Sequence, residues 1–172
     1  GDKAKASYAN ETALEYYGKL LPLLIKSEEK ISFHLKRGEI FQLLGKWIDT
    51  ESEYQAALDI SQQINMPTSI ALSQKSMGIL CTAQGNLEDA LNWLQNAFST
   101  YEKLEDKLGL SQTLNQIGAV HWRTGDYSAA QDCLGRGLQI SREIDDKRTI
   151  ADALHQLGNV NDSLGKHDVE LF

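Results

Sequence analysis

Four histidines are the side chains of this 172-residue sequence best suited to metal binding or acid–base chemistry, and their spacing pairs none of them. His34, His121, His155 and His167 include no HxxxH or HExxH pair, and no cysteine or carboxylate stands at ligand spacing from them. We therefore interpret them as surface or partly packed residues and expect no metal site. Stacking of distant segments could still bring two of them together.

The two cysteines do not indicate nucleophilic or redox chemistry. Cys81 and Cys133 form no CxxC motif, and neither has an adjacent cationic residue that would lower its pKa. Cys81 falls on a helical phase predicted to face the core, where a small buried hydrophobe is expected. With no nucleophile, paired carboxylates or triad order, the sequence predicts a protein that is not an enzyme.

Two segments resemble a phosphate-binding loop only superficially. A glycine precedes a Gly-Lys pair in the segments 38–46 and 158–166. The phosphate loop requires four residues between its glycines and a serine or threonine after the lysine. Here six residues intervene, and Trp47 or His167 follows the lysine. We therefore expect no nucleotide and no other cofactor.

Composition and charge exclude several classes of partner. The formal net charge of −7 argues against nucleic acid or an anionic membrane as the main partner. No apolar run approaches the roughly 20 residues that a membrane-spanning helix needs. Two unpaired cysteines are typical of a reducing compartment. We expect a soluble, cytoplasmic protein.

A glycine recurs along the sequence at a fixed spacing of 40 residues. It stands at positions 38, 78, 118 and 158, and a second glycine follows seven residues later in each copy. The apolar residues around these glycines recur at intervals of three and four residues, which is the periodicity of a helix. A fixed period of this size predicts stacked repeats. The sequence therefore predicts an all-α fold, an α-solenoid of antiparallel helix pairs.

Each repeat is predicted to contain a first helix, helix A, and a second helix, helix B. Helix A is expected at residues 28–44, 68–84, 108–124 and 148–164, and helix B at residues 47–64, 87–104 and 127–144. Glycine just after a helix is the usual left-handed cap, so the second glycine of each copy is expected in the turn. We expect one array over residues 1–172, with units at 13–27 (partial), 28–67, 68–107, 108–147 and 148–172 (truncated).

The two ends depart from the repeat. An amphipathic helix is predicted from Ala13, with a kink rather than a stop at Pro22. A turn at Gly165–Lys166 and a shortened helix B from His167 are expected at the other end. We interpret the chain as a fragment of a larger protein, whose uncovered last helix A would favour self-association.

The first glycine of each copy lies inside helix A and requires a packing reason, because an interior glycine costs about 1 kcal/mol relative to alanine. Small residues recur on the facing helix B, namely Thr50, Ala90 and Ala130. We therefore predict close approach of the two backbones at these glycines.

The repeat resembles the tetratricopeptide repeat over residues 13–172. The resemblance rests on a glycine, a second glycine seven residues later and an alanine five residues after that. The third copy matches best, through Gly118, Gly125, Tyr127 and Ala130. The 40-residue length is similar to arrays of polarity adaptors, peptide-sensing bacterial regulators and large bacterial signalling ATPases or nucleotide cyclases. The opening ALEYYGKLLPLL with LLGKW resembles the last group most. The resemblance implies a right-handed superhelix whose A helices line a concave groove.

The resemblance also implies which residues face that groove. The candidate partner-binding residues are Lys75, Ile79, Thr82, Asn115, Trp122, Arg123, His155 and Asn159. Asparagine can grip a peptide backbone, and tryptophan can anchor a partner. We expect a protein-interaction scaffold, a regulatory region of a larger signalling protein. Its partner segment would carry an acidic residue near an apolar one, with a basic residue toward the fourth unit. Two alternatives stay open, a peptide-sensing module and a structural or self-association spacer.

Overall fold

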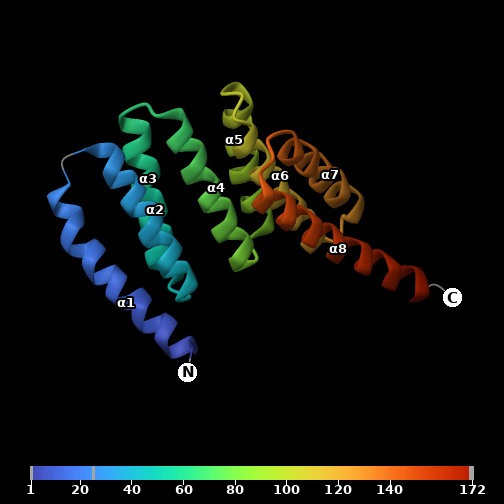
Figure 1. Ribbon diagram of the computed structural model, residues 1–172, viewed down its shortest axis with the longest axis horizontal. Coiled ribbons are helices and arrows are strands. Elements are labelled where there is room, and N and C mark those ends of the chain that lie inside the picture. The colour runs from blue at the N-terminus through green and yellow to red at the C-terminus, as the bar shows by residue number, and fades with distance from the viewer. Residues whose placement is uncertain (1, 25, 171–172) are drawn as a thin grey trace. The chain divides into compact units, whose positions relative to one another are not determined.

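The protein is entirely helical over the residues that the structure, a computed structural model, describes. These are residues 2–24 and 26–170, with side chains at 9–24 and 26–165. The elements are α1 (Asp2–Leu20), the 3₁₀ helix η1 (Leu21–Leu23), α2 (Ser27–Leu43), α3 (Trp47–Gln63), α4 (Pro67–Gln84), α5 (Leu87–Lys103), α6 (Lys107–Thr124), α7 (Tyr127–Glu143) and α8 (Lys147–Glu170) (Figure 1). The predicted fold class, an α-solenoid of helix pairs, is confirmed.

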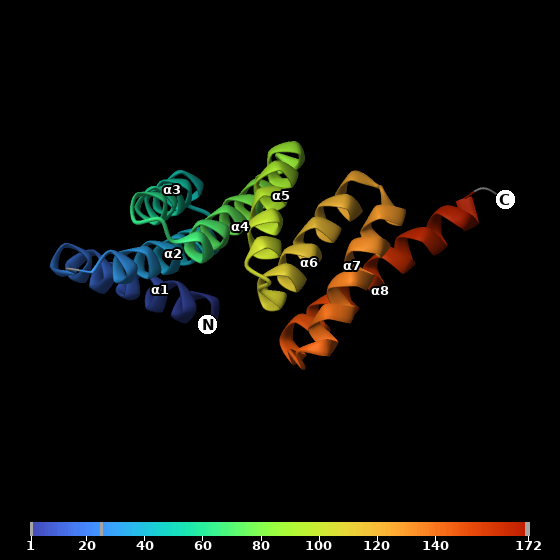
Figure 2. The ribbon, with the colours of Figure 1, turned by 90° about the horizontal axis from the view of Figure 1, so that it is seen from above.

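The chain forms two compact units, which we describe separately. The first spans Gly1–Leu80, and the second spans Cys81–Phe172. In the first unit, α2 packs against α3. In the second, α6 packs against α5, α7 and α8. Helices α6, α7 and α8 lie side by side (Figure 2). The predicted helices agree with the observed ones to within a residue or two, except at the two ends of the chain.

A backbone motif ends each helix before the next one begins. Gly45, Gly85 and Gly125 follow A helices and adopt the left-handed conformation, with φ of 71°, 84° and 82°. At the first of these turns, the Lys46 amide donates to the carbonyl of Phe41 (2.9 Å) and the Gly45 amide to that of Gln42 (3.0 Å). These two bonds make the Schellman motif, which satisfies carbonyls that the helix leaves unpaired. The predicted glycine caps are thus confirmed at three of the four turns.

The N-terminal caps differ between helices. Asp106 accepts a hydrogen bond from the Gly109 amide at the start of α6 (2.9 Å), and Asp126 accepts one from Ala129 at the start of α7 (3.0 Å). The caps of α3 and α5, Lys46 and Asn86, make no such side-chain bond. Only some helices are therefore capped by a side chain.

The core follows the predicted apolar phases. Leu80, Val120 and Val160 of the A helices are at most 1% exposed, and Ile40 is half-buried. The small helix-B residues Thr50, Ala90 and Ala130 are fully buried. In the second unit, Cys81 joins the cluster of Leu94 and Val120 and is 8% exposed, as a small buried hydrophobe should be.

The proline near the start of the chain ends its helix, which corrects the predicted kink. The α-helix α1 stops at Leu20, and Pro22 lies in η1, a single 3₁₀ turn. Leu24 is already extended, with ψ of 126°. The proline lacks an amide proton and crowds the preceding turn, and no buried residue in η1 compensates for the lost hydrogen bond.

The last helix does not turn at the fourth glycine pair, which corrects a second prediction. Helix α8 continues through Gly165 to Glu170. The predicted turn at Gly165–Lys166 is therefore wrong, and so is the separate helix from His167. Gly165 is not among the glycines with positive φ. A glycine permits the left-handed cap, but it does not impose one when the residues beyond it continue as a helix.

Close approach at the helix-A glycines is real for two copies and absent for the fourth. A Cβ added at Gly118 would lie 2.6 Å from Leu134 Cγ and 3.3 Å from the Ala130 carbonyl oxygen. At Gly38 it would lie 2.3 Å from the ring of Tyr54, rather than against Thr50. Gly158 faces open space, because α8 continues straight and no helix folds back over that glycine in the described residues.

Candidate functional site

The candidate residues on α4 are mostly covered. Lys75 is 9% exposed and Thr82 is 8% exposed, whereas Ile79 is half-buried and borders an open pocket. Lys75 and Ile79 belong to the first unit and Thr82 to the second. Of these three, Ile79 offers the most side-chain surface to a partner.

Asn115 is committed to packing within the second unit. It is 2% exposed, and its Nδ2 donates to the carbonyl oxygen of Thr149 on α8 (3.2 Å). Its buried Oδ1 has no hydrogen-bond partner among the described residues and lies so near Gly137 that a Cβ there would be 2.5 Å away. The side chain therefore couples α6 to α8 in this conformation.

Trp122 and Arg123, at the end of α6, each reach one repeat away. The Arg123 guanidinium donates through Nη1 to the Thr82 carbonyl oxygen (2.5 Å), in the last turn of α4. A cation at this end of a helix is favourable, because the last carbonyls are unpaired and the helix dipole is negative there. Trp122 donates through Nε1 to Ser163 Oγ on α8 (3.0 Å), and 36% of the residue is exposed.

The candidates on α8 lie beside that tryptophan contact. The Ser163 hydroxyl that accepts from Trp122 donates in turn to the Asn159 carbonyl oxygen (2.8 Å). The Asn159 side chain is partly exposed, and His155, one turn earlier, is exposed. The structure thus brings Trp122 and Asn159 to neighbouring faces of α6 and α8, with the indole Nε1 bonded to Ser163 and about a third of the tryptophan residue exposed.

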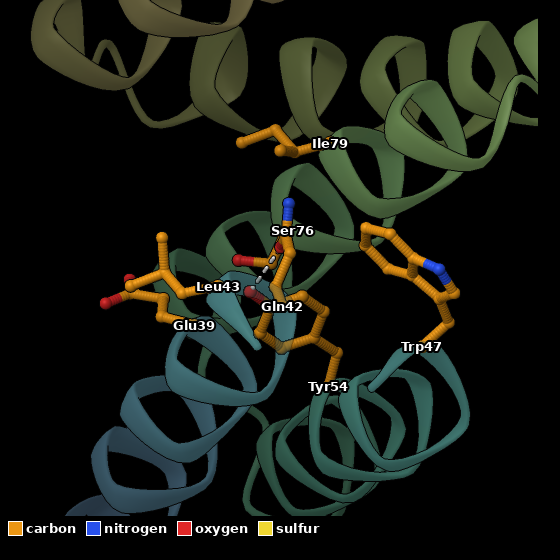
Figure 3. Close-up of a pocket in the computed structure, with 7 residues that line it drawn as sticks. All are labelled: Glu39, Gln42, Leu43, Trp47, Tyr54, Ser76 and Ile79. Atoms are coloured by element: carbon orange, nitrogen blue, oxygen red, sulfur yellow. Dashed lines mark hydrogen bonds between the residues drawn. The ribbon is translucent and has the colours of Figure 1, made fainter. Parts of the chain in front are cut away.

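A pocket in the first unit was not predicted as a whole. It has a volume of about 480 Å³ and is lined by Glu39, Gln42, Leu43, Trp47, Tyr54, Ser76 and Ile79 (Figure 3). Glu39, Gln42 and Ile79 are groove positions by the repeat pattern, but Trp47 and Tyr54 come from helix B. Their spacing of seven residues, which places both on one face of α3, is the signal that could have revealed the pocket.

A polar cluster joins α2 to α3 in the same unit. Glu53 accepts from His34 Nδ1 (2.7 Å) and pairs with Arg37 (3.2 Å), and the three side chains are only 12–19% exposed. Arg37 also lies over the ring of Phe41, 5.7 Å from its centroid. These residues hold the helix pair together.

The Cys133 thiol of the second unit is partly buried beside a carboxylate. Burial raises the pKa of the Cys133 thiol, and the neighbouring Asp132 carboxylate raises it further. The thiolate, which is the nucleophilic form, is therefore disfavoured. Among the described side chains, no group of three histidines, cysteines or carboxylates is placed to hold a metal ion. None of the described helices has both the length and the apolar composition of a membrane span.

Known proteins share this architecture. The family model described as "Tetratricopeptide repeat" matches residues 31–103 and 109–171. The regulatory protein RapG of Bacillus subtilis (strain 168) is 28% identical over 112 residues, which are 64% of this chain and 31% of RapG.

Two solved structures also match, both at 17% identity. Aspartyl phosphate phosphatase F from Bacillus subtilis has a TM-score of 0.83, over 95% of this chain and 45% of that one. The Rap conjugation gene regulator of the plasmid pLS20, in complex with the Phr* peptide, has a TM-score of 0.68, over 98% and 52%. The chain spans about a third of the curated relative and about half of each structure.

Proposed function

Because the chain belongs to the tetratricopeptide repeat family, we propose that it is a protein-interaction module, the regulatory repeat region of a larger signalling protein. It binds a partner segment along the accessible faces of its A helices. The observation that carries this proposal is Trp122, a large aromatic side chain left 36% exposed between α6 and α8. Aromatic anchors of this kind dominate the binding energy of protein interfaces once they are buried.

The relatives favour regulation and, within it, peptide recognition. RapG is named as a regulatory protein, and the plasmid pLS20 regulator was solved with a bound peptide. A peptide-sensing module is therefore the second candidate function. One relative is named as a phosphatase, but we propose no catalysis by these 172 residues. The raised pKa of Cys133 disfavours that thiol as a nucleophile. A cytoplasmic location is part of the same proposal.

The accessible groups define the face in the second unit. We assign partner contact to Trp122, His155 and Asn159 of the second unit. Ile79 is a separate candidate contact within the first unit. Thr82, Asn115 and Arg123 also belong to the second unit, but they are buried or bonded within it, and Lys75 is buried in the first unit. Their role in the proposal is to hold the A helices in place. A partner that displaces the Arg123 guanidinium from the Thr82 carbonyl oxygen could pair with the positive charge of Arg123.

The proposal is tested by selecting displayed random peptides on the immobilised 172-residue protein and measuring affinities of the selected peptides by fluorescence anisotropy. Trp122→Ala should weaken binding by about tenfold or more, the effect of removing an aromatic anchor. Trp122→Phe keeps an aromatic surface but removes the Nε1–H bond to Ser163, so it should retain most of the affinity. Gln95→Ala, at an exposed position of helix α5, is the matched control and should bind normally.

Thermal melting of the same variants separates binding from packing. If Trp122→Ala lowers the melting temperature and spares binding, the tryptophan is a packing residue and the face is elsewhere. If no peptide is selected above background, the spacer interpretation is favoured.

A further inference from the structure

The pocket of the first unit combines aromatic walls with a single charge. Trp47 and Tyr54 of α3, Leu43 of α2 and Ile79 of α4 surround it, and Glu39 stands at its edge (Figure 3). Leu43 is 77% exposed and Trp47 is 40% exposed, although both are large and apolar. Tyr54 is 2% exposed and forms the floor, where its hydroxyl donates to Gln42 Oε1 (3.0 Å).

Among the described residues, Glu39 has no basic partner that neutralises its charge. Its side chain is exposed and makes no hydrogen bond or ion pair with the residues that the structure describes. Lys46 in the adjoining turn directs its ammonium group to the ring of Phe41, 5.9 Å away, and does not line the pocket. The lining residues therefore carry one negative charge and no positive charge.

The field of that carboxylate reaches the pocket floor. Burial raises the pKa of Tyr54 well above its ordinary value, and the negative charge of Glu39 raises it further. The phenol therefore stays neutral and donates to Gln42. A cation entering between Glu39 and Trp47 would meet both a carboxylate and the ring of an exposed tryptophan.

We infer that this pocket binds a basic side chain, arginine or lysine, of the partner segment, with the ring of Trp47 covering its aliphatic stem and Glu39 pairing with its charge. The inference rests on the proposed function, because it names one contact of the segment bound by the A helices. The volume of about 480 Å³ accommodates one such side chain and an aliphatic neighbour against Leu43 and Ile79.

Other occupants fit less well. An acidic side chain would be repelled by Glu39 at the pocket edge. A purely aliphatic side chain would cover the rings but leave the carboxylate without a counter-charge, so it would lose the electrostatic contribution that a basic one gains. The chain's formal charge of −7 further favours approach of a basic segment.

The test uses a defined probe, acetyl-Leu-Arg-Leu-amide, titrated into the whole 172-residue protein while the indole N–H resonance of Trp47 is followed by NMR. A saturable shift is expected. Acetyl-Leu-citrulline-Leu-amide has nearly the same shape without the charge and should bind several-fold more weakly. Glu39→Gln should weaken binding of the arginine probe about twofold to fivefold, the upper part of the range for an exposed ion pair.

The control variant is Glu51→Gln, which removes the same charge from an exposed site on α3 outside the pocket and should change the affinity less than twofold. Equal binding of the arginine and citrulline probes, an unchanged affinity in Glu39→Gln, or no saturable shift at Trp47 would each overturn the inference. Because this readout does not involve Trp122, it can fail while selected peptides whose affinity depends on Trp122 still bind, and the reverse also holds.

Discussion

The helix pairs α2–α3 and α6–α7 share one repeat pattern but fill their interfaces with opposite chemistry. At positions 80 residues apart, His34, Arg37 and Glu53 of the first pair correspond to Leu114, Ile117 and Cys133 of the second. The first interface therefore holds a partly buried ion cluster, with His34 and Arg37 on one carboxylate. In the second, Leu114 and Ile117 are at most 8% exposed.

The glycine of each pair also faces a different neighbour. Gly38 lies against the ring of Tyr54, whereas Gly118 lies against Leu134 and the Ala130 backbone. The comparison teaches that the repeat pattern sets where helices approach, while the residues between them are free to be polar or apolar. Three predictions follow from these differences, ordered by the expected change in the free energy of unfolding.

The largest effect is expected at the close glycine contact of the α6–α7 pair. Gly118→Leu should lower the free energy of unfolding by about 1–3 kcal/mol, because its Cβ alone would fall 2.6 Å from Leu134 Cγ. Urea unfolding followed by circular dichroism measures this change.

The same substitution at the fourth copy provides the control. Gly158→Leu meets open space and should leave stability unchanged or raise it by up to about 0.7 kcal/mol, since leucine favours a helix more than glycine does. Equal losses at the two positions would show that backbone approach does not distinguish them.

The second prediction concerns the ion cluster of the α2–α3 pair. Glu53→Ala removes the one carboxylate that His34 and Arg37 share and should cost about 2–3 kcal/mol, somewhat less than for fully buried pairs. Replacing the whole cluster with the residues of the other pair, His34→Leu, Arg37→Ile and Glu53→Cys, should restore most of this loss. Calorimetric melting of the two variants tests it. If the triple variant is less stable than Glu53→Ala, the ion cluster contributes more to the free energy of unfolding than apolar packing does at these positions.

The smallest effect is expected at the start of helix B. Asp126 caps α7 through the Ala129 amide, whereas Lys46, at the corresponding position before α3, makes no side-chain cap bond. Asp126→Ala should therefore lower the free energy of unfolding by about 1 kcal/mol. Lys46→Ala removes no side-chain cap bond and should cost less. Thermal melts at matched concentration measure both. A comparable loss for Lys46→Ala would contradict the distinction between a capped and an uncapped helix.

The fold could be predicted from the sequence because its signals are local and repeated. Apolar spacing identifies helices, and a glycine after the last apolar residue identifies where α2, α4 and α6 stop. The two failures are also local. Pro22 ends α1, and Gly165 does not end α8. In both places a single residue permits two outcomes, and the residue type alone does not decide between them.

The candidate site was less predictable, because it depends on contacts between residues 34 to 41 positions apart. The sequence places Asn115 and Arg123 on helix A, but it does not show that the Thr149 and Thr82 carbonyls lie within hydrogen-bond reach. Likewise, it places Glu39 on a groove phase without showing that Trp47 and Tyr54 surround the space beside it. Which polar groups remain available to a partner is decided by distances between helices.

The turns that end the helices have a consequence for how such an array can evolve. Each is closed by main-chain atoms, as when the Met66 amide donates to the Ser61 carbonyl (2.9 Å), and only one residue per turn needs positive φ. That residue is glycine after the A helices but Asn65, Glu105 or Asp145 after the B helices. Most turn residues can therefore be substituted without changing the register of the helices. The ends of the repeats are free to acquire new surface chemistry while the helices between them stay in place.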